Sequence, residues 1–172
     1  MPLFYLLHFL NKKGKINNKE SKYMNSEKEL KSMGVDFELI VLTRALHSVH
    51  DVQVACNCEA SEVIKTLVFV GSNPIVAIMP GDKRANIARI EELTGERGLR
   101  MAKPAEVTAL TGYGVGSVSP FGINPAIKQI ADNSILDLPS LFLGSGKSDA
   151  LIKISQTEFG KSFRGAFASI SE

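Results

Sequence analysis

The segment Thr111–Gly122, which is Thr-Gly-Tyr-Gly-Val-Gly-Ser-Val-Ser-Pro-Phe-Gly, constrains the fold of this chain more than any other. Its four glycines, two serines and one proline leave little apolar surface to bury, so the segment must be a loop between two elements. Glycine tolerates positive φ and lets a ligand approach the main chain, so N–H groups here can face an anion or a developing oxyanion. The same composition is also typical of a loop that only reverses the chain.

A lysine interrupts the apolar segment Val63–Val70. The β-branched and aromatic residues of this segment predict a largely buried strand. Because an ammonium is costly to bury, Lys65 must reach an edge, pair with a carboxylate or face a polar cleft in which its charge is used. The residues by themselves leave these three alternatives open.

The lysine strand and the glycine-rich loop occur together with further segments that resemble one family, the YbaK and prolyl-tRNA synthetase-associated editing domains. The resemblance extends from about Met24 to about Phe159. Its most specific parts are the strand around Lys65 and the loop that ends in Ser-Pro-Phe-Gly. The matching segments are Ile64–Phe69, Ile78–Lys83, Arg100–Val107, Thr111–Gly122, Asp132 and Gly144–Lys147.

Members of this family hydrolyse the ester that joins an amino acid to the terminal ribose of a mischarged tRNA, and the resemblance implies the same reaction here. A hydrophobic synthetase pocket discriminates by only about 1–3 kcal/mol per methylene, so a second site must remove the errors. The implied substrates are cysteinyl-, alanyl-, seryl- or threonyl-tRNA, recognised at the acceptor end, with tRNA(Pro) as the expected carrier. An aminoacyl-tRNA synthetase is a further candidate partner, and no cofactor or metal is implied.

The resemblance also assigns roles to residues. Lys65 would hold the terminal phosphate, the ribose or the reacting carbonyl, Ser119 would orient the substrate or cap the loop, and Asp132 would hold the amino group or orient water. Main-chain N–H groups of the loop would stabilise the oxyanion, and losing one such donor costs about 2.7–4 kcal/mol of transition-state stabilisation. The candidate substrate-binding residues are Gly112, Tyr113, Gly114, Gly116, Ser117 and Gly146.

Other interpretations of these residues remain open. Ser119 can simply satisfy a turn before the following proline, and Asp132 with the next residue is an ordinary turn pair. Many family members have a glycine where this chain has Ser117, which leaves the size of the acyl pocket open.

A non-catalytic module that binds the tRNA acceptor end or a synthetase is the rival function. No Ser-His-Asp triad can be assembled from the three histidines, so attack by water or by a group of the substrate is favoured; these histidines are His8, His47 and His50.

Charge separates the first 23 residues from the rest of the chain. They contain five lysines and one glutamate, a net charge of +4, whereas the residues from Met24 onward contain 15 basic and 17 acidic residues. We expect residues 1–23 to be a disordered basic tail that could bind RNA phosphates, or an artefact if Met24 is the true start. Residues 24–172 are expected to form one editing domain without an overall basic footprint, so RNA contacts must be local and DNA is not an expected partner.

The composition, 172 residues of which 44% are hydrophobic, predicts one soluble domain. No apolar segment approaches the roughly 18–20 residues that span a bilayer, so no membrane association is expected. Cys56 and Cys58 are too close together for an easy disulfide and lack the second ligand pair of a zinc site. Free thiols and the absence of a secretory signal pattern lead us to expect a cytoplasmic protein.

The predicted helices and strands do not alternate regularly. Helices are expected over residues 26–34, 48–58, 84–94 and 104–110, the first two from capping boxes that begin at Ser26 and Ser48. Strands are expected over residues 37–42, 63–70, 75–79, 127–131, 138–143 and 149–154, with an antiparallel hairpin turning at Gly71–Pro74. This order predicts a single α+β domain with a mixed, mostly antiparallel, barrel-like sheet surrounded by helices.

Overall fold

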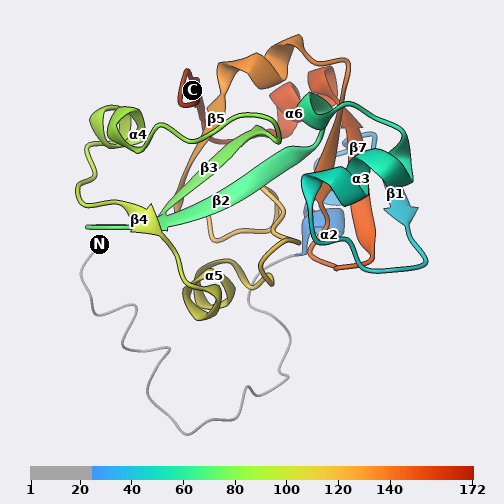
Figure 1. The fold of residues 1–172 in the computed structure, drawn as a ribbon, viewed down its shortest axis with the longest axis horizontal. Coiled ribbons are helices and arrows are strands. Elements are labelled where there is room, and N and C mark those ends of the chain that lie inside the picture. The colour runs from blue at the N-terminus through green and yellow to red at the C-terminus, as the bar shows by residue number, and fades with distance from the viewer. Residues whose placement is uncertain (1–24) are drawn as a thin grey trace, which may run out of the picture.

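The structure is a computed structural model that describes residues 25–172, so the predicted basic tail lies outside the described residues. The described chain forms two sheets (Figure 1). The larger sheet has the strand order β4-β2-β3-β5-β8, and the smaller has the order β1-β7-β6. The strands are β1 Glu38–Val41, β2 Ile64–Val70, β3 Ile75–Pro80, β4 Arg100–Met101, β5 Lys128–Asp132, β6 Ser140–Gly144, β7 Ala150–Ser155 and β8 Ala166–Ala168.

Strand pairing is mixed and mostly antiparallel, and the α+β class is confirmed. β2 and β3 form the predicted hairpin, in which Lys65 lies opposite Met79 and Thr66 lies opposite Ile78. The pairs β1–β7, β6–β7 and β2–β4 are also antiparallel, whereas β3–β5 and β5–β8 are parallel. The prediction of a barrel-like sheet is wrong, because β4, with two residues, and β8, with three, remain as edges of an open sheet.

The central strand β3 is buried along its whole length and separates two hydrophobic clusters. Side chains alternate along a strand, so Val76 and Ile78 pack in one cluster while Ile75 and Met79 pack in the other. Ile90 of helix α4 belongs to the second cluster, so α4 covers that face of the sheet.

Five α-helices lie within residues 25–172: α2 Ser26–Ser32, α3 Val49–Cys56, α4 Ile87–Thr94, α5 Pro104–Thr111 and α6 Gln156–Ser162. The predicted capping box of α3 is present, since Ser48 and Asp51 each bond the other's main chain. The predicted capping box at Ser26 is wrong, because the side chain of Asn25 caps α2 and accepts from the Lys28 N–H. Three elements have no predicted counterpart: β4, α6 and β8.

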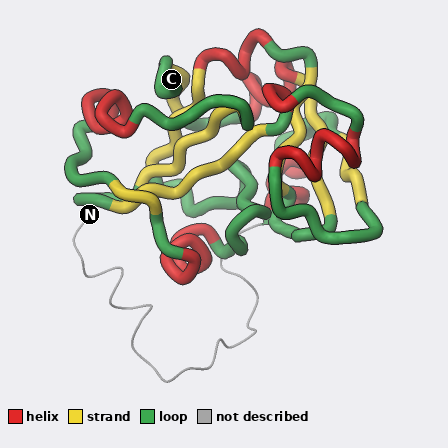
Figure 2. Tube along the Cα trace, in the orientation of Figure 1, coloured by secondary structure: helices red, strands yellow, loops and turns green. Residues whose placement is uncertain are grey.

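A long loop joins α5 to β5 and contains no helix or strand (Figure 2). It begins at Gly112, which ends α5 with a left-handed φ of 77°. The glycine-rich segment predicted to be a loop is therefore a loop, and it lies between helix α5 and β5, an inner strand of the larger sheet.

Candidate active site

A cavity of about 400 Å³ lies where β2, the α5–β5 loop and the β6–β7 turn meet. Lys65 and Thr66 of β2, Gly116 and Ser117 of the loop, and Lys147 of the turn all border it. Much of the remaining wall is apolar and includes Leu46, Val52, Val68, Val107, Val118 and Phe142. Three residues that the sequence marked as site candidates, Lys65, Gly116 and Ser117, are thus brought to one cavity.

The ammonium of Lys65 has no carboxylate within ion-pair distance in the described chain. Its Nζ instead donates a hydrogen bond to the main-chain carbonyl of Lys83, in the segment that follows β3. Burial lowers the pKa of Lys65 below its ordinary value, although the negative charge of Asp82 acts in the opposite direction. Because an ammonium has three N–H donors, the bond to Lys83 leaves two for a ligand.

The loop forms a tight turn at the cavity. The Ser117 N–H donates to the Gly114 carbonyl at 3.1 Å, and Gly116 has a φ of 86°, as at the third position of a type II turn. The N–H groups of Val115 and Gly116 donate no hydrogen bond within residues 25–172. Both residues border the cavity, so this turn places two unpaired N–H groups in residues of the cavity wall.

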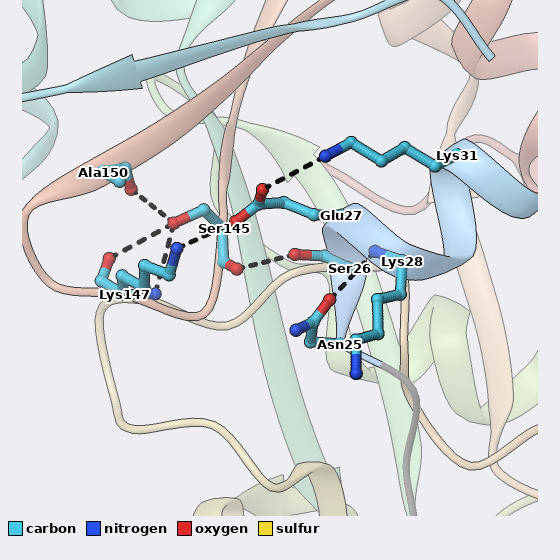
Figure 3. A network of polar contacts seen from close by, with 8 residues as sticks. All are labelled: Asn25, Ser26, Glu27, Lys28, Lys31, Ser145, Lys147 and Ala150. Carbon is cyan, nitrogen blue, oxygen red and sulfur yellow. Dashed lines mark hydrogen bonds and ion pairs between the residues drawn. The ribbon is translucent and has the colours of Figure 1, made fainter.

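The β6–β7 turn is held in place by the first turn of α2 (Figure 3). Ser26 Oγ donates to the Ser145 carbonyl at 2.6 Å, and Lys147 Nζ pairs with Glu27 at 2.9 Å. Ser145 Oγ in turn donates to the Ala150 carbonyl at 2.7 Å. These contacts fix Lys147 at the edge of the cavity, although α2 is far from the turn in sequence.

Tyr113 and Gly146 contact each other and do not border the cavity. The Tyr113 hydroxyl donates to the Phe121 carbonyl at 2.7 Å, and a Cβ added to Gly146 would lie 2.6 Å from the Tyr113 ring. The Gly146 N–H donates to the Ser117 carbonyl at 2.8 Å, so this glycine joins the turn to the loop. Gly112 and Gly114 also do not border the cavity. They precede residues 115–118, the part of the loop that does border it.

Ser119 and Asp132 are buried and hydrogen-bonded inside the protein, away from the cavity wall. Ser119 Oγ accepts from the Phe121 N–H at 3.2 Å, and Asp132 accepts from the Ser134 and Ile170 N–H groups, each at 3.0 Å. Burial acts to raise the pKa of Asp132, but the hydrogen bonds that its carboxylate accepts outweigh burial and hold the pKa below its ordinary value. The predicted catalytic roles of both residues stay predictions, and their contacts are those of structural residues.

The part of the chain that contains the Lys65 strand, the glycine-rich loop and the β6–β7 turn matches a known family. The family model described as the aminoacyl-tRNA editing domain matches residues 43–161. The chain belongs to the aminoacyl-tRNA editing domain family. The resemblance found in the sequence is confirmed, and with it, at the level of the family, the prediction of an enzyme of the deacylase class.

The curated relatives of this editing domain include proline–tRNA ligases. It is 29% identical over 114 residues to the proline–tRNA ligase of Nitratidesulfovibrio vulgaris (strain DP4), a match that covers 66% of this chain and 20% of the ligase. The chain thus spans about a fifth of the length of the curated relatives it matches.

Two solved structures share the fold of the editing domain. The crystal structure of a hypothetical protein has a TM-score of 0.80 and 30% identity, and the match covers 85% of this chain and 98% of that chain. The structure of a candidate trans-editing enzyme for prolyl tRNA synthetase has a TM-score of 0.76 and 26% identity, covering 84% of this chain and 92% of that chain.

Several residues of the editing-domain cavity have no counterpart among the predicted site residues, notably Thr66, Lys147 and Ser148. Lys147 lies in a segment that resembles the family, but only Gly146 was assigned from that segment. Thr66 follows Lys65 directly, and nothing in the order of residues marks it as part of a cavity wall.

Neither a metal centre nor a catalytic triad is formed by the described part of the editing domain. No group of three or more His, Cys, Asp or Glu side chains there could hold a metal ion. Ser48 and Asp51 form the α3 capping box, and no hydrogen bond joins the His47 imidazole to either side chain. Burial raises the pKa of the Cys58 thiol to about 11, so this thiol is a poor nucleophile near neutral pH.

No helix within residues 25–172 combines the length and apolarity that a membrane crossing requires.

A second cavity, of about 580 Å³, lies on the α6 side of the editing domain. Phe121, Gln129, Phe163 and Arg164 border it, together with the later part of the α5–β5 loop. None of the site residues predicted from the sequence borders this second cavity.

Proposed function

We propose that this editing domain hydrolyses the ester bond of mischarged aminoacyl-tRNA, with tRNA(Pro) as carrier and a small acyl group: cysteinyl, alanyl, seryl or threonyl. The observation that carries this proposal is the meeting of Lys65 with the free N–H groups of Val115 and Gly116 around one cavity, in a chain of the editing family. The proline–tRNA ligase and the candidate trans-editing enzyme among its relatives support the choice of carrier and of a synthetase partner.

The chemistry of the cavity suits an ester that is already activated. Water attacks the carbonyl carbon, and the carbonyl oxygen becomes an oxyanion stabilised by N–H and ammonium donors. When the tetrahedral intermediate collapses, the carbon–oxygen bond to the ribose breaks, and the ribose oxygen takes the proton lost by the attacking group. The apolar wall formed by Val68, Val107 and Val118 gives a small acyl side chain a dry surface.

Replacing Lys65 by methionine tests this proposal directly. The Lys65→Met variant keeps the alkyl stem and removes the charge, so we expect about a 100-fold or greater loss of amino acid release from mischarged tRNA(Pro). Thermal unfolding is expected to change little, because the variant loses one hydrogen bond, to the Lys83 carbonyl, but also removes a partly buried ammonium that has no ion pair within the described residues. Lys161→Met, at a side chain that is 68% exposed and pairs only with Glu158, is the matched control and should hydrolyse like wild type.

The results separate an enzyme from a binding module. Wild-type protein that binds mischarged tRNA but releases no amino acid would support the non-catalytic alternative and overturn the deacylase proposal. Full activity of Lys65→Met would remove Lys65 from the mechanism. A panel of alanyl-, cysteinyl-, seryl- and threonyl-tRNA(Pro) identifies the acyl group.

A further inference from the structure

Polar side chains from two segments that are distant in sequence meet at the edge of the candidate active-site cavity. His47 comes from the segment before α3, and Lys147 and Ser148 come from the β6–β7 turn; all three border the cavity. The Leu46 N–H donates to the Ser148 carbonyl at 3.0 Å, so a hydrogen bond joins the two segments at this point. We call His47, Lys147 and Ser148 the cavity rim.

The polar groups of the cavity rim can be reached by a ligand. The His47 imidazole and the Ser148 hydroxyl make no hydrogen bond within residues 25–172. Lys147 Nζ pairs with Glu27 at 2.9 Å, yet the lysine side chain is 57% exposed (Figure 3). Its main-chain N–H donates to the Ser145 hydroxyl at 3.2 Å, so the turn that carries the ammonium is fixed from both sides. An ammonium, an imidazole and a hydroxyl therefore lie on one supported edge.

The charged residues that border the cavity have one sign. Lys65 and Lys147 are among them, and no Asp or Glu is among the described residues of the cavity wall. Asp149 follows the cavity rim in sequence but does not border the cavity. Such a wall favours an anionic group. In a mischarged tRNA that group is the phosphodiester between the last two nucleotides, because it is attached to the same ribose as the reacting ester.

The two lysines of the wall differ in their exposure. Lys65 is partly buried in β2, and its Nζ donates to the Lys83 carbonyl, whereas Lys147 is exposed on a turn. The acyl ester is the end of the substrate and can enter the cavity. The phosphodiester continues into the rest of the tRNA, so it must stay at the edge, where Lys147 lies.

We propose that the cavity rim binds the phosphodiester between the last two nucleotides of the tRNA, with the Lys147 ammonium as the charge and His47 and Ser148 as hydrogen-bond donors. The inference rests on the proposed deacylase function. It divides the work between the lysines: Lys147 binds the phosphate, and Lys65 acts on the reacting carbonyl. A phosphate contact carries no base information, so the cavity rim positions the ester in the same way for every tRNA.

A cycle that combines an enzyme variant with a substrate variant tests the contact. The substrates are a tRNA(Pro) minihelix charged with the best amino acid of the panel above and the same minihelix with a methylphosphonate at the last linkage, where a methyl group replaces one charged oxygen. Lys147→Met is expected to lower kcat/KM for the phosphate minihelix by roughly 3- to 10-fold, between the value of an exposed ion pair and that of a charged hydrogen bond. The slope of log kcat/KM against log salt should become shallower by about 0.7, the value for one single-strand phosphate.

The other two side chains of the cavity rim each supply one neutral donor. His47→Ala and Ser148→Ala are therefore expected to lower kcat/KM for the phosphate minihelix by roughly 2- to 12-fold. No loss in either variant would overturn the cavity rim as a joint phosphate site.

Lys31→Met is the matched control for Lys147→Met. Lys31 pairs with the same Glu27, at 3.9 Å, is 70% exposed and does not border the cavity. Both variants lose one positive charge and one ion pair with Glu27, so their unfolding midpoints should be similar. Lys31→Met is expected to hydrolyse like wild type. An equal loss of kcat/KM in both variants would show a general effect of charge or of α2 and would overturn the inference.

The penalty of Lys147→Met should vanish for the methylphosphonate minihelix, whereas Lys65→Met should lose as much activity on both substrates. An equal Lys147→Met penalty on both substrates, or none on either, would overturn the phosphate assignment. A Lys65→Met penalty that vanishes with the methylphosphonate would place the phosphate on Lys65 instead. If wild type hydrolyses neither minihelix, the proposed function fails, and competition binding of the two minihelices to wild type and Lys147→Met still decides whether Lys147 contacts the phosphate.

Discussion

Two residues that the sequence assigned to catalysis, Lys65 and Asp132, have opposite environments. Lys65 borders the cavity and its ammonium donates to the Lys83 carbonyl, whereas Asp132 is 3% exposed and its carboxylate accepts main-chain N–H groups from two segments. A carboxylate in this position caps the residues that follow β5 and joins β5 to the C-terminal segment at Ile170. Its contacts predict a role in stability.

Asp132→Asn is expected to lower the free energy of unfolding by about 1–3 kcal/mol, because one amide cannot replace both accepting oxygens. The pKa of Asp132 is lower in the folded than in the unfolded chain, so its stabilisation is complete above the unfolded pKa of about 3.9. That stabilisation is lost as the pH falls through the folded pKa. Urea unfolding of both proteins at neutral and acidic pH should show a difference that shrinks on acidification. Equal stability with abolished hydrolysis would instead support the predicted catalytic role.

The α5–β5 loop and the β6–β7 turn act as one unit, because each supports the other across the cavity edge. Gly146 of the turn packs on the Tyr113 ring and donates to the Ser117 carbonyl, while Gly116 forms the tip of the loop. Both glycines have positive φ, at 91° and 86°, but only Gly146 is crowded, since nothing lies within 4 Å of a Cβ at Gly116.

This contrast predicts different costs for the same substitution. Gly116→Ala is expected to lower the free energy of unfolding by about 1–2 kcal/mol, because the added Cβ strains a left-handed φ and meets no neighbour. Gly146→Ala adds a clash with the Tyr113 ring, so we expect a total loss of about 2–5 kcal/mol in the free energy of unfolding. Chemical denaturation of the two variants in parallel measures the difference. Equal losses would show that the turn moves freely away from Tyr113.

The whole editing domain assembles its cavity from segments that are distant along the chain. The Ser26–Ser145 hydrogen bond, which holds the turn, joins residues 119 positions apart. Residues 24–172 contain more acidic than basic residues. Under the proposed function, tRNA is therefore bound through local groups such as Lys65 and Lys147, or through the basic residues 1–23.

Deleting residues 1–23 tests the second of these routes. If their lysines contact phosphates, the truncated protein should bind tRNA more weakly, and the slope of log affinity against log salt should become shallower by up to about 0.9 per lysine engaged. Filter binding at several salt concentrations measures both quantities. An unchanged slope and affinity would exclude residues 1–23 from tRNA binding, and the catalytic rate at saturating tRNA should be the same for both chains.

The local structure of this protein is encoded in short segments, and sequence patterns predicted most of it. The β2–β3 hairpin, the α3 capping box and the glycine that ends α5 each depend on a few neighbouring residues, whose φ limits and caps act within one or two turns. The cap of α6 is equally local, since the Ser155 side chain accepts from the Glu158 N–H, yet the sequence analysis predicts no helix there. Tertiary contacts alone decided that Thr66 and Lys147 share a cavity with Lys65, that Asp132 does not, and that the sheet stays open. Those outcomes depend on packing between distant segments, which no local preference of the chain specifies.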